Sequence, residues 1–101
     1  MPTVTALSQS QINEKLKALP QWKLANNALE RVEKFPNYLD AVGFVYKLGH
    51  EAEQADHHPD IIMNYKTVTI QFSTHSAGGI TELDFKMAHI AEKLIAAAGQ
   101  V

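Results

Sequence analysis

Residues 61–73 read IIMNYKTVTIQFS and contain the clearest strand pattern of the chain. From Thr67 to Ser73 apolar and polar residues alternate strictly, which predicts a strand with one buried face and one polar face. Ile61 to Asn64 predicts a shorter strand before it, and Tyr65-Lys66 forms the turn between them. Strands joined by so short a turn pair antiparallel, so we expect an antiparallel sheet.

A short helix and a second hairpin precede this stretch. Ser8 with Gln11 three residues later is a capping box, and Pro20 ends the helix that the box starts. Two short strands follow, one around Trp22 and one over residues 28–35. Asn26-Asn27 between them can adopt the positive φ angles of a tight hairpin turn.

Two longer helices complete the pattern. Asn37 with Asp40 predicts the cap of a helix that reaches about Ala55, and Thr81 caps a last helix. We expect the first of these to bury Tyr38, Ala41, Val42, Val45, Leu48 and Ala52. We expect the last helix to bury Ile80, Leu83, Met87, Ile90, Ala91 and Leu94. The order α-β-β-α-β-β-α predicts an α+β fold: a four-stranded, mainly antiparallel sheet with helices packed on one face, in a single domain over residues 1–101.

The composition narrows the classes of function. Apolar residues make up 46% of the chain and charged residues 20%, as in ordinary globular proteins, and the net charge is -2. No basic patch is visible, so we expect no direct contact with nucleic acid. The chain has no cysteine, which excludes disulfides, thiolate nucleophiles and thiolate metal sites. We find no signal peptide and no apolar run of the ~20 residues that span a membrane, and we expect a cytoplasmic protein.

Three of the five histidines stand at the ends of predicted elements. His57 and His58 separate the long helix from the third strand, and His75 follows the fourth. In a hairpin the start of one strand lies beside the end of the other, so we expect these three side chains to be close together. Loops at such ends, held by a rigid scaffold, are the usual place for catalytic groups.

Several neighbours could support the histidines. Glu53 precedes His57 by four residues, so on a continuous helix its carboxylate would hydrogen-bond that imidazole and fix its tautomer. Pro59 holds His58 in an extended conformation, and Gly78-Gly79 would let a flat ligand approach the backbone. Asp84 is explained by a capping box with Thr81. The spacing alone slightly favours ordinary loop histidines over an active site.

The combined pattern Glu53-x3-His57-His58-Pro59-x5-Tyr65-x9-His75-x8-Asp84 resembles the full signature of the pterin-4a-carbinolamine dehydratases. Seven positions at fixed spacings are far more specific than a lone His-His-Pro, and none departs from the signature. The resemblance implies a hydro-lyase that removes water from 4a-hydroxytetrahydrobiopterin. The product would be a quinonoid dihydropterin, which is recycled to the tetrahydropterin of aromatic amino acid hydroxylases. Neither a cofactor nor a metal is implied.

The implied chemistry is proton transfer. The hydroxide at C4a is a poor leaving group unless it is protonated, and the proton on N5 must also depart. Imidazole, with an ordinary pKa of ~6.5, can serve either step near neutral pH. We assign the proton transfers to His57, oriented by Glu53, and to His75, while His58 binds and orients the pterin. Asp84 would hold His75 or a pterin nitrogen.

Other functions stay open. Three histidines with Glu53 or Asp84 could ligate zinc in a hydrolase, although neighbouring histidines in an extended segment seldom converge on one ion. Animal members of the family also serve as dimerisation partners of a homeodomain transcription factor. Apolar residues off the predicted stripes would suit such a coactivator role through a helix face, namely Phe44, Tyr46 and Phe85. A dehydratase-like protein could also act on another pterin. From the family and from the free edges of the sheet we expect a homodimer or homotetramer.

Overall fold

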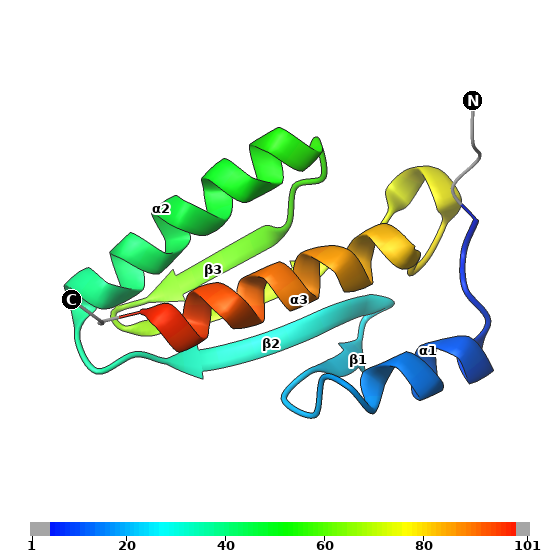
Figure 1. Ribbon diagram of the computed structural model, residues 1–101, viewed down its shortest axis with the longest axis horizontal. Helices are drawn as coiled ribbons and strands as arrows, with labels where there is room; N and C mark the ends of the chain where they lie inside the picture. The colour runs from blue at the N-terminus through cyan, green and yellow to red at the C-terminus, as the bar shows by residue number, and fades with distance from the viewer. Residues whose placement is uncertain (1–4, 99–101) are drawn as a thin grey trace.

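The computed structural model describes residues 5–98, in which three α-helices accompany one four-stranded sheet (Figure 1). The elements in chain order are α1 (Gln9–Leu16), β1 (Lys23–Ala25), β2 (Ala28–Lys34), α2 (Tyr38–Ala55), β3 (Asp60–Asn64), β4 (Thr67–Phe72), the short 3-10 helix η1 (His75–Ala77) and α3 (Glu82–Ala97). The predicted order of helices and strands is confirmed. After β4 the chain forms the 3-10 helix η1, at a place where no helix was predicted.

The helix starts are capped by the side chains that the sequence indicated. Ser8 and Gln11 form the capping box of α1, and Asn37 accepts the backbone N–H of Asp40 at 2.9 Å. Thr81 and Asp84 form a second capping box at α3. Each cap pairs backbone N–H groups that have no partner inside the helix, so the helices begin at these residues.

The sheet has the strand order β1-β2-β4-β3, and all neighbouring strands are antiparallel. The β1–β2 hairpin turns at Asn26 and Asn27, whose φ angles are 51° and 61°. Asp60 pairs with Gln71 across the β3–β4 hairpin. The start of β3 therefore lies beside the end of β4, as predicted, and β2 flanks the other side of β4.

The helices α2 and α3 pack on one face of the sheet and contact each other, which confirms the predicted fold class (Figure 1). Beneath them Val68, Ile70 and Phe72 are fully buried, as the alternation in β4 predicted. An ion pair of 3.0 Å between Lys15 and Glu82 attaches α1 to the start of α3. Within residues 5–98, no helix combines the length and the apolar character needed to cross a membrane.

The buried face of α2 differs in part from the predicted stripe. The members buried as predicted are Ala41, Leu48 and Ala52, and Val45 is half-buried against the core. Tyr38 and Val42 are exposed instead, whereas Phe44 is buried. The rings of Phe44 and Phe35 pack with their centroids 5.1 Å apart, and this contact turns the helix so that Phe44 faces the sheet.

The first turn of α3 is buried more deeply than predicted. Ile80, Met87 and Ala91 are buried as expected, and Leu83, Ile90 and Leu94 are half-buried. Asp84 and Phe85 also face the interior, with 0% and 4% of their surface exposed. Phe44 and Phe85 are thus core residues, and of the three candidates for a partner surface only Tyr46 is exposed.

A buried arginine joins α3 to the sheet. Arg31 Nε donates to Oε2 of Glu92 at 2.7 Å, and the indole N–H of Trp22 donates to the same oxygen at 2.8 Å. Arg31 also contacts Glu33 at 2.9 Å, so its charge has two carboxylate partners. This cluster fixes α3 along β2 and thereby the position of Asp84 at the start of α3.

Candidate active site

The helix α2 ends immediately before the paired histidines. Asp56 has a left-handed backbone conformation with φ of 50°, which aspartate adopts more easily than most residues. Its N–H donates to the carbonyls of Ala52 and Glu53, and the N–H of His57 donates to the carbonyl of Ala52. This reversal breaks the helical spacing between Glu53 and His57 and directs His57 to the helix side of the sheet.

His57 is held by a buried carboxylate. Its Nε2 lies 2.6 Å from Oδ1 of Asp84; the imidazole is 11% exposed and the carboxylate is fully buried. The ring lies nearly parallel to that of Phe72, with an interplanar angle of 10° and a centroid distance of 6.2 Å. Groups from β4 and α3 thus fix both the position and the plane of the imidazole.

Besides His57, two further donors hold Asp84 in place. Its Oδ2 accepts the hydroxyl of Thr74 at 2.8 Å and the backbone N–H of Thr81 at 2.9 Å. Because Thr74 uses its one proton on Asp84, the 2.8 Å contact between the Thr74 and Thr81 hydroxyls has Thr81 as its donor. The hydroxyl oxygen of Thr81 accepts the N–H of Leu83 at 3.2 Å. The predicted capping-box acid is therefore also the anchor of His57.

These partners decide which nitrogen of His57 carries a proton. A carboxylate only accepts, so Nε2 is the donor in the contact with Asp84. Among residues 5–98, Nδ1 of His57 has no hydrogen-bond partner, and no buried side-chain nitrogen or oxygen is left unpaired. Nδ1 therefore reaches the protein surface, where the neutral imidazole presents a lone pair that can accept a proton.

Glu53 orients His58, and our prediction that it orients His57 was wrong. The Oε1 of Glu53 lies 2.8 Å from Nε2 of His58, because the left-handed residue Asp56 moves His57 away from the helix axis. The side chains of Glu53 and His58 are 79% and 57% exposed, so this pair contributes little to stability. It leaves His58 in the same tautomer as His57, with Nε2 donating. Pro59, half-buried, follows and leads into β3.

His75 starts η1 directly after Thr74 and is exposed. The backbones of Thr74 and Gly79 are bonded in both directions, at 2.9 and 3.4 Å, which closes the loop that carries His75. Gly78 in this loop has φ of 73°, a conformation that glycine adopts without strain. Asp84 therefore binds the ring of His57 directly, and through Thr74 it also holds the loop that carries His75.

Two further expectations about the site change. Among residues 5–98, Asp84 accepts hydrogen bonds from His57, Thr74 and Thr81 and not from His75, and its side chain is fully buried. Tyr65, although part of the signature, lies in the β3–β4 turn at the opposite end of β3 from Asp60, where its ring stacks on Tyr38. Thr74 was not among the predicted site residues, although its inward position two residues after Phe72 follows from the alternation of the strand.

A hollow of about 180 Å³ lies beside His75. It is lined by Asn26, Asn27, Ser73, Thr74, His75, Gly78 and Gly79. The structure therefore places Gly78 and Gly79 in a concave surface next to a histidine, and it adds the two asparagines of the β1–β2 turn. Neither asparagine carries a signal in the sequence other than that of a hairpin turn.

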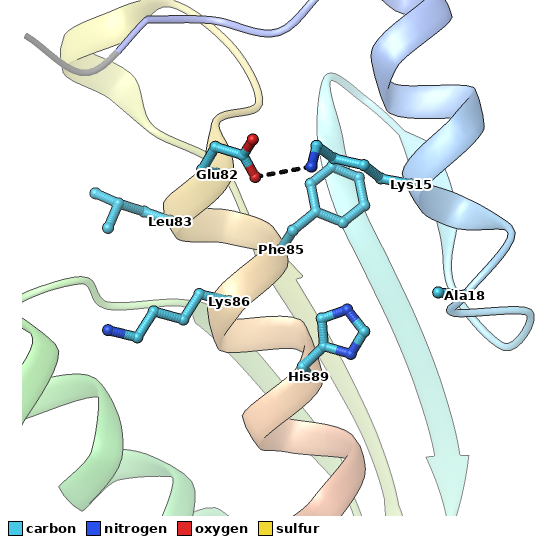
Figure 2. Close-up of a pocket in the computed structure, with 7 residues that line it drawn as sticks. All are labelled: Lys15, Ala18, Glu82, Leu83, Phe85, Lys86 and His89. Carbon is cyan, nitrogen blue, oxygen red and sulfur yellow. Dashed lines mark ion pairs between the residues drawn. The ribbon is translucent and has the colours of Figure 1, made fainter.

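A larger hollow of about 520 Å³ lies elsewhere, between α1 and α3 (Figure 2). Its walls include Ala18, Leu83 and Phe85, and the ion pair of Lys15 with Glu82 stands at one end. Figure 2 shows the side chains of Lys86 and His89, which both line this hollow, pointing away from each other, so their nitrogens do not converge on a common ligand. We place the candidate active site at the signature histidines, because there the polar groups are fixed by hydrogen bonds.

The zinc alternative finds no support in the arrangement of side chains. Within residues 5–98, no three His, Asp or Glu residues lie together in a way that could hold a metal ion. His57 and His58 each direct Nε2 to a different carboxylate.

The fold and this cluster define an α+β protein with two histidine–carboxylate pairs where a helix meets an antiparallel sheet. The family model described as pterin 4 alpha carbinolamine dehydratase matches residues 5–94. The chain belongs to this family, as the signature indicated.

Individual relatives agree with this assignment. A protein of Picosynechococcus sp. named "Putative pterin-4-alpha-carbinolamine dehydratase" is 42% identical over 90 residues, which are 89% of this chain and 98% of that protein. A protein of the same name from Mycolicibacterium smegmatis is 42% identical over 92 residues, 91% of this chain and 98% of its own. The crystal structure of a transcriptional coactivator/pterin dehydratase from Brucella melitensis aligns with a TM-score of 0.86 and 37% identity, over 89% of this chain and 98% of that one.

Proposed function

We propose that this protein removes water from 4a-hydroxytetrahydrobiopterin and releases quinonoid dihydropterin. The observation that carries the proposal is the fixed imidazole of His57, whose Nε2 is bound to the buried Asp84 while Nδ1 has no partner among residues 5–98. Membership of the dehydratase family supplies the class of substrate. Because the reaction recycles the cofactor of a hydroxylase, we place it with such enzymes in the cytoplasm.

We assign His57 as the general base and His75 as the general acid. Nδ1 of His57 takes the proton from N5, and the electron pair of that N–H bond forms the N5=C4a double bond. The C4a–O bond breaks as His75 donates a proton to the leaving hydroxide, so water departs and no electrons are gained or lost. Each positioned acid or base contributes about 10²–10⁴-fold. His58, oriented by Glu53, binds and orients the pterin ring.

The test is direct. Freshly generated 4a-hydroxytetrahydropterin is mixed with the protein and dehydration is followed by ultraviolet absorbance. We expect His57→Ala and His75→Ala to lower kcat by about 10²-fold or more, and His58→Ala to act mainly on KM. His50→Ala and His89→Ala are matched controls, because both residues are exposed in the middle of helices. A rate that does not exceed the uncatalysed background, or that survives loss of all three signature histidines, would overturn the proposal.

A second role, in protein association, is favoured by the exposed side of α2. Leu39, Val42 and Tyr46 lie on one helix face, with 74%, 37% and 68% of their surface exposed. The relative from Brucella melitensis is described as a transcriptional coactivator as well as a dehydratase. We propose that this face joins two copies of the chain in a homodimer or homotetramer, and that it is the place for any further protein partner.

Association is tested by sedimentation. Tyr46→Glu should dissociate the oligomer, because it places a charge among apolar side chains that are buried on association. Lys47→Glu, at the neighbouring exposed position, is the matched control. An assembly that is unchanged by Tyr46→Glu, or a wild-type chain that is monomeric, would contradict this use of α2.

A further inference from the structure

The β1–β2 turn stands against the loop of His75. The φ angles of Asn26 and Asn27 are both positive, as a two-residue hairpin turn of type I′ requires. Nδ2 of Asn27 donates to the carbonyl of Gly78 at 3.4 Å, and a Cβ built on Gly79 would lie 4.0 Å from Oδ1 of Asn27. Glycine is the least strained residue at the second position of such a turn, so the side chain of Asn27 is present at a conformational cost that its bond to Gly78 helps to offset.

Of the residues that the structure describes, no aspartate, glutamate, lysine or arginine lines the hollow between this turn and the loop. Thr74 is committed to Asp84, and Asn27 to Gly78. Within the described part of the chain, the amide of Asn26 and the hydroxyl of Ser73 have no hydrogen-bond partner, and both line the hollow. These two groups both donate and accept hydrogen bonds, so they match the hydroxyl groups of a ligand.

The volume of the hollow indicates that it takes part of a ligand. Pockets that enclose a whole small molecule measure roughly 300–1,000 Å³. This hollow measures about 180 Å³, which suits a short substituent. The position of the hollow in the sheet separates it from two of the histidines. At the end of β4, His57 and His58 lie on the side of β3, whereas the hollow lies on the side of β2 and the β1–β2 turn. His75 lines the hollow.

The chemistry of the pterin identifies the substituent. N5 is bonded to both C4a and C6, so the group on C6 is the substituent nearest to the atoms at which the proton transfers occur. A ring placed between His57 and His75 can direct that group into the hollow beside His75. We propose that the hollow binds a hydroxylated side chain at C6 of the substrate, through Asn26 and Ser73. This inference rests on the proposed dehydratase function and adds to it the residues that bind the side chain of the substrate.

The experiment compares two substrates. One 4a-hydroxytetrahydropterin carries a dihydroxypropyl group at C6 and the other a methyl group. Asn26→Gly removes the amide while keeping the turn, because glycine accepts positive φ. Ser73→Ala removes the hydroxyl, and Asn64→Ala, an exposed amide at the far end of β3, is the matched control.

For each of Asn26→Gly and Ser73→Ala, we expect the ratio of kcat/KM for the dihydroxypropyl substrate over the methyl substrate to fall by about 3- to 10-fold, the range of one uncharged hydrogen bond. The change should lie in KM. Asn64→Ala should leave the ratio as in the wild type. A ratio that stays unchanged in both variants would overturn this inference while leaving the dehydratase function intact. A wild-type protein that dehydrates neither substrate would overturn the proposed function instead.

Discussion

Replacing Asp84 with asparagine should change the tautomer of His57 without changing the shape of the site. Asparagine offers one acceptor oxygen and one NH₂ donor. The hydroxyl of Thr74 and the N–H of Thr81 both require an acceptor on the side of Oδ2, so the oxygen stays there and the NH₂ faces Nε2 of His57. Two donors cannot face each other at 2.6 Å, and the neutral imidazole avoids this by moving its proton to Nδ1.

The magnitude follows from the loss of one base. With a proton on Nδ1, His57 can no longer accept the proton of N5, so kcat should fall by about 10²–10⁴-fold, or about 3–5 kcal/mol of transition-state stabilisation. The free energy of unfolding should also fall, by about 1.5–3 kcal/mol, because the hydrogen bonds to His57, Thr74 and Thr81 no longer involve a charged group. Domains of this kind are stable by about 5–15 kcal/mol, so the variant remains folded.

Two measurements check the reasoning. Ultraviolet absorbance gives kcat, and ¹⁵N NMR of the imidazoles shows which nitrogen of His57 is protonated. Asp40→Asn makes the same exchange in the first turn of α2, away from the histidines, and serves as the control. A folded Asp84→Asn protein with kcat within threefold of the wild type, or with the proton of His57 still on Nε2, would refute the argument.

Thr74→Val removes the donor to Asp84 and should lower the free energy of unfolding by about 2–3 kcal/mol, whereas Thr74→Ser keeps the hydroxyl and should lose about 1 kcal/mol. Urea unfolding followed by the fluorescence of the one tryptophan measures both, and equal losses would contradict the role of the hydroxyl. Glu53→Gln should lower kcat/KM less than tenfold, because its contact with His58 is exposed and water can replace it; a loss as large as that of His57→Ala in the same kinetic assay would show a catalytic role for Glu53. Glu92→Gln should lower the free energy of unfolding by about 1.5–3 kcal/mol, because Arg31 loses its 2.7 Å carboxylate partner. Glu51→Gln, which changes a half-buried glutamate of α2, is the control, and an equal effect of the two would refute the contribution of that contact.

Local signals predicted most of the fold. The alternation in β4, the hairpin asparagines and the three helix caps depend on residues within a few positions of one another, so one sequence is enough to find them. The buried face of α2 was harder to predict. Its apolar residues lie on more than one side of the helix, and the contact of Phe44 with Phe35, which determines the orientation, joins two elements.

The contacts within the candidate site were harder to predict than its place in the fold. The position of His57 and His58 beside the end of β4 follows from hairpin geometry and was foreseen. The pairing of Glu53 with His58 depends on the left-handed conformation of Asp56, and an aspartate at a helix end does not by itself indicate that conformation. The contact of His57 with Asp84 crosses 27 residues of chain, and no local pattern specifies it.

The carboxylate of Asp84 closes the first turn of α3 with one oxygen and holds His57 with the other. A positively charged imidazole attracts that carboxylate more strongly than a neutral one. Each proton that His57 gains should therefore tighten the start of the helix, and each proton that it loses should let the turn fray more often. Amide hydrogen exchange at Thr81, whose N–H is bonded to Asp84, would then be slower when the imidazole is positively charged, so that a helix terminus reports the charge of the base.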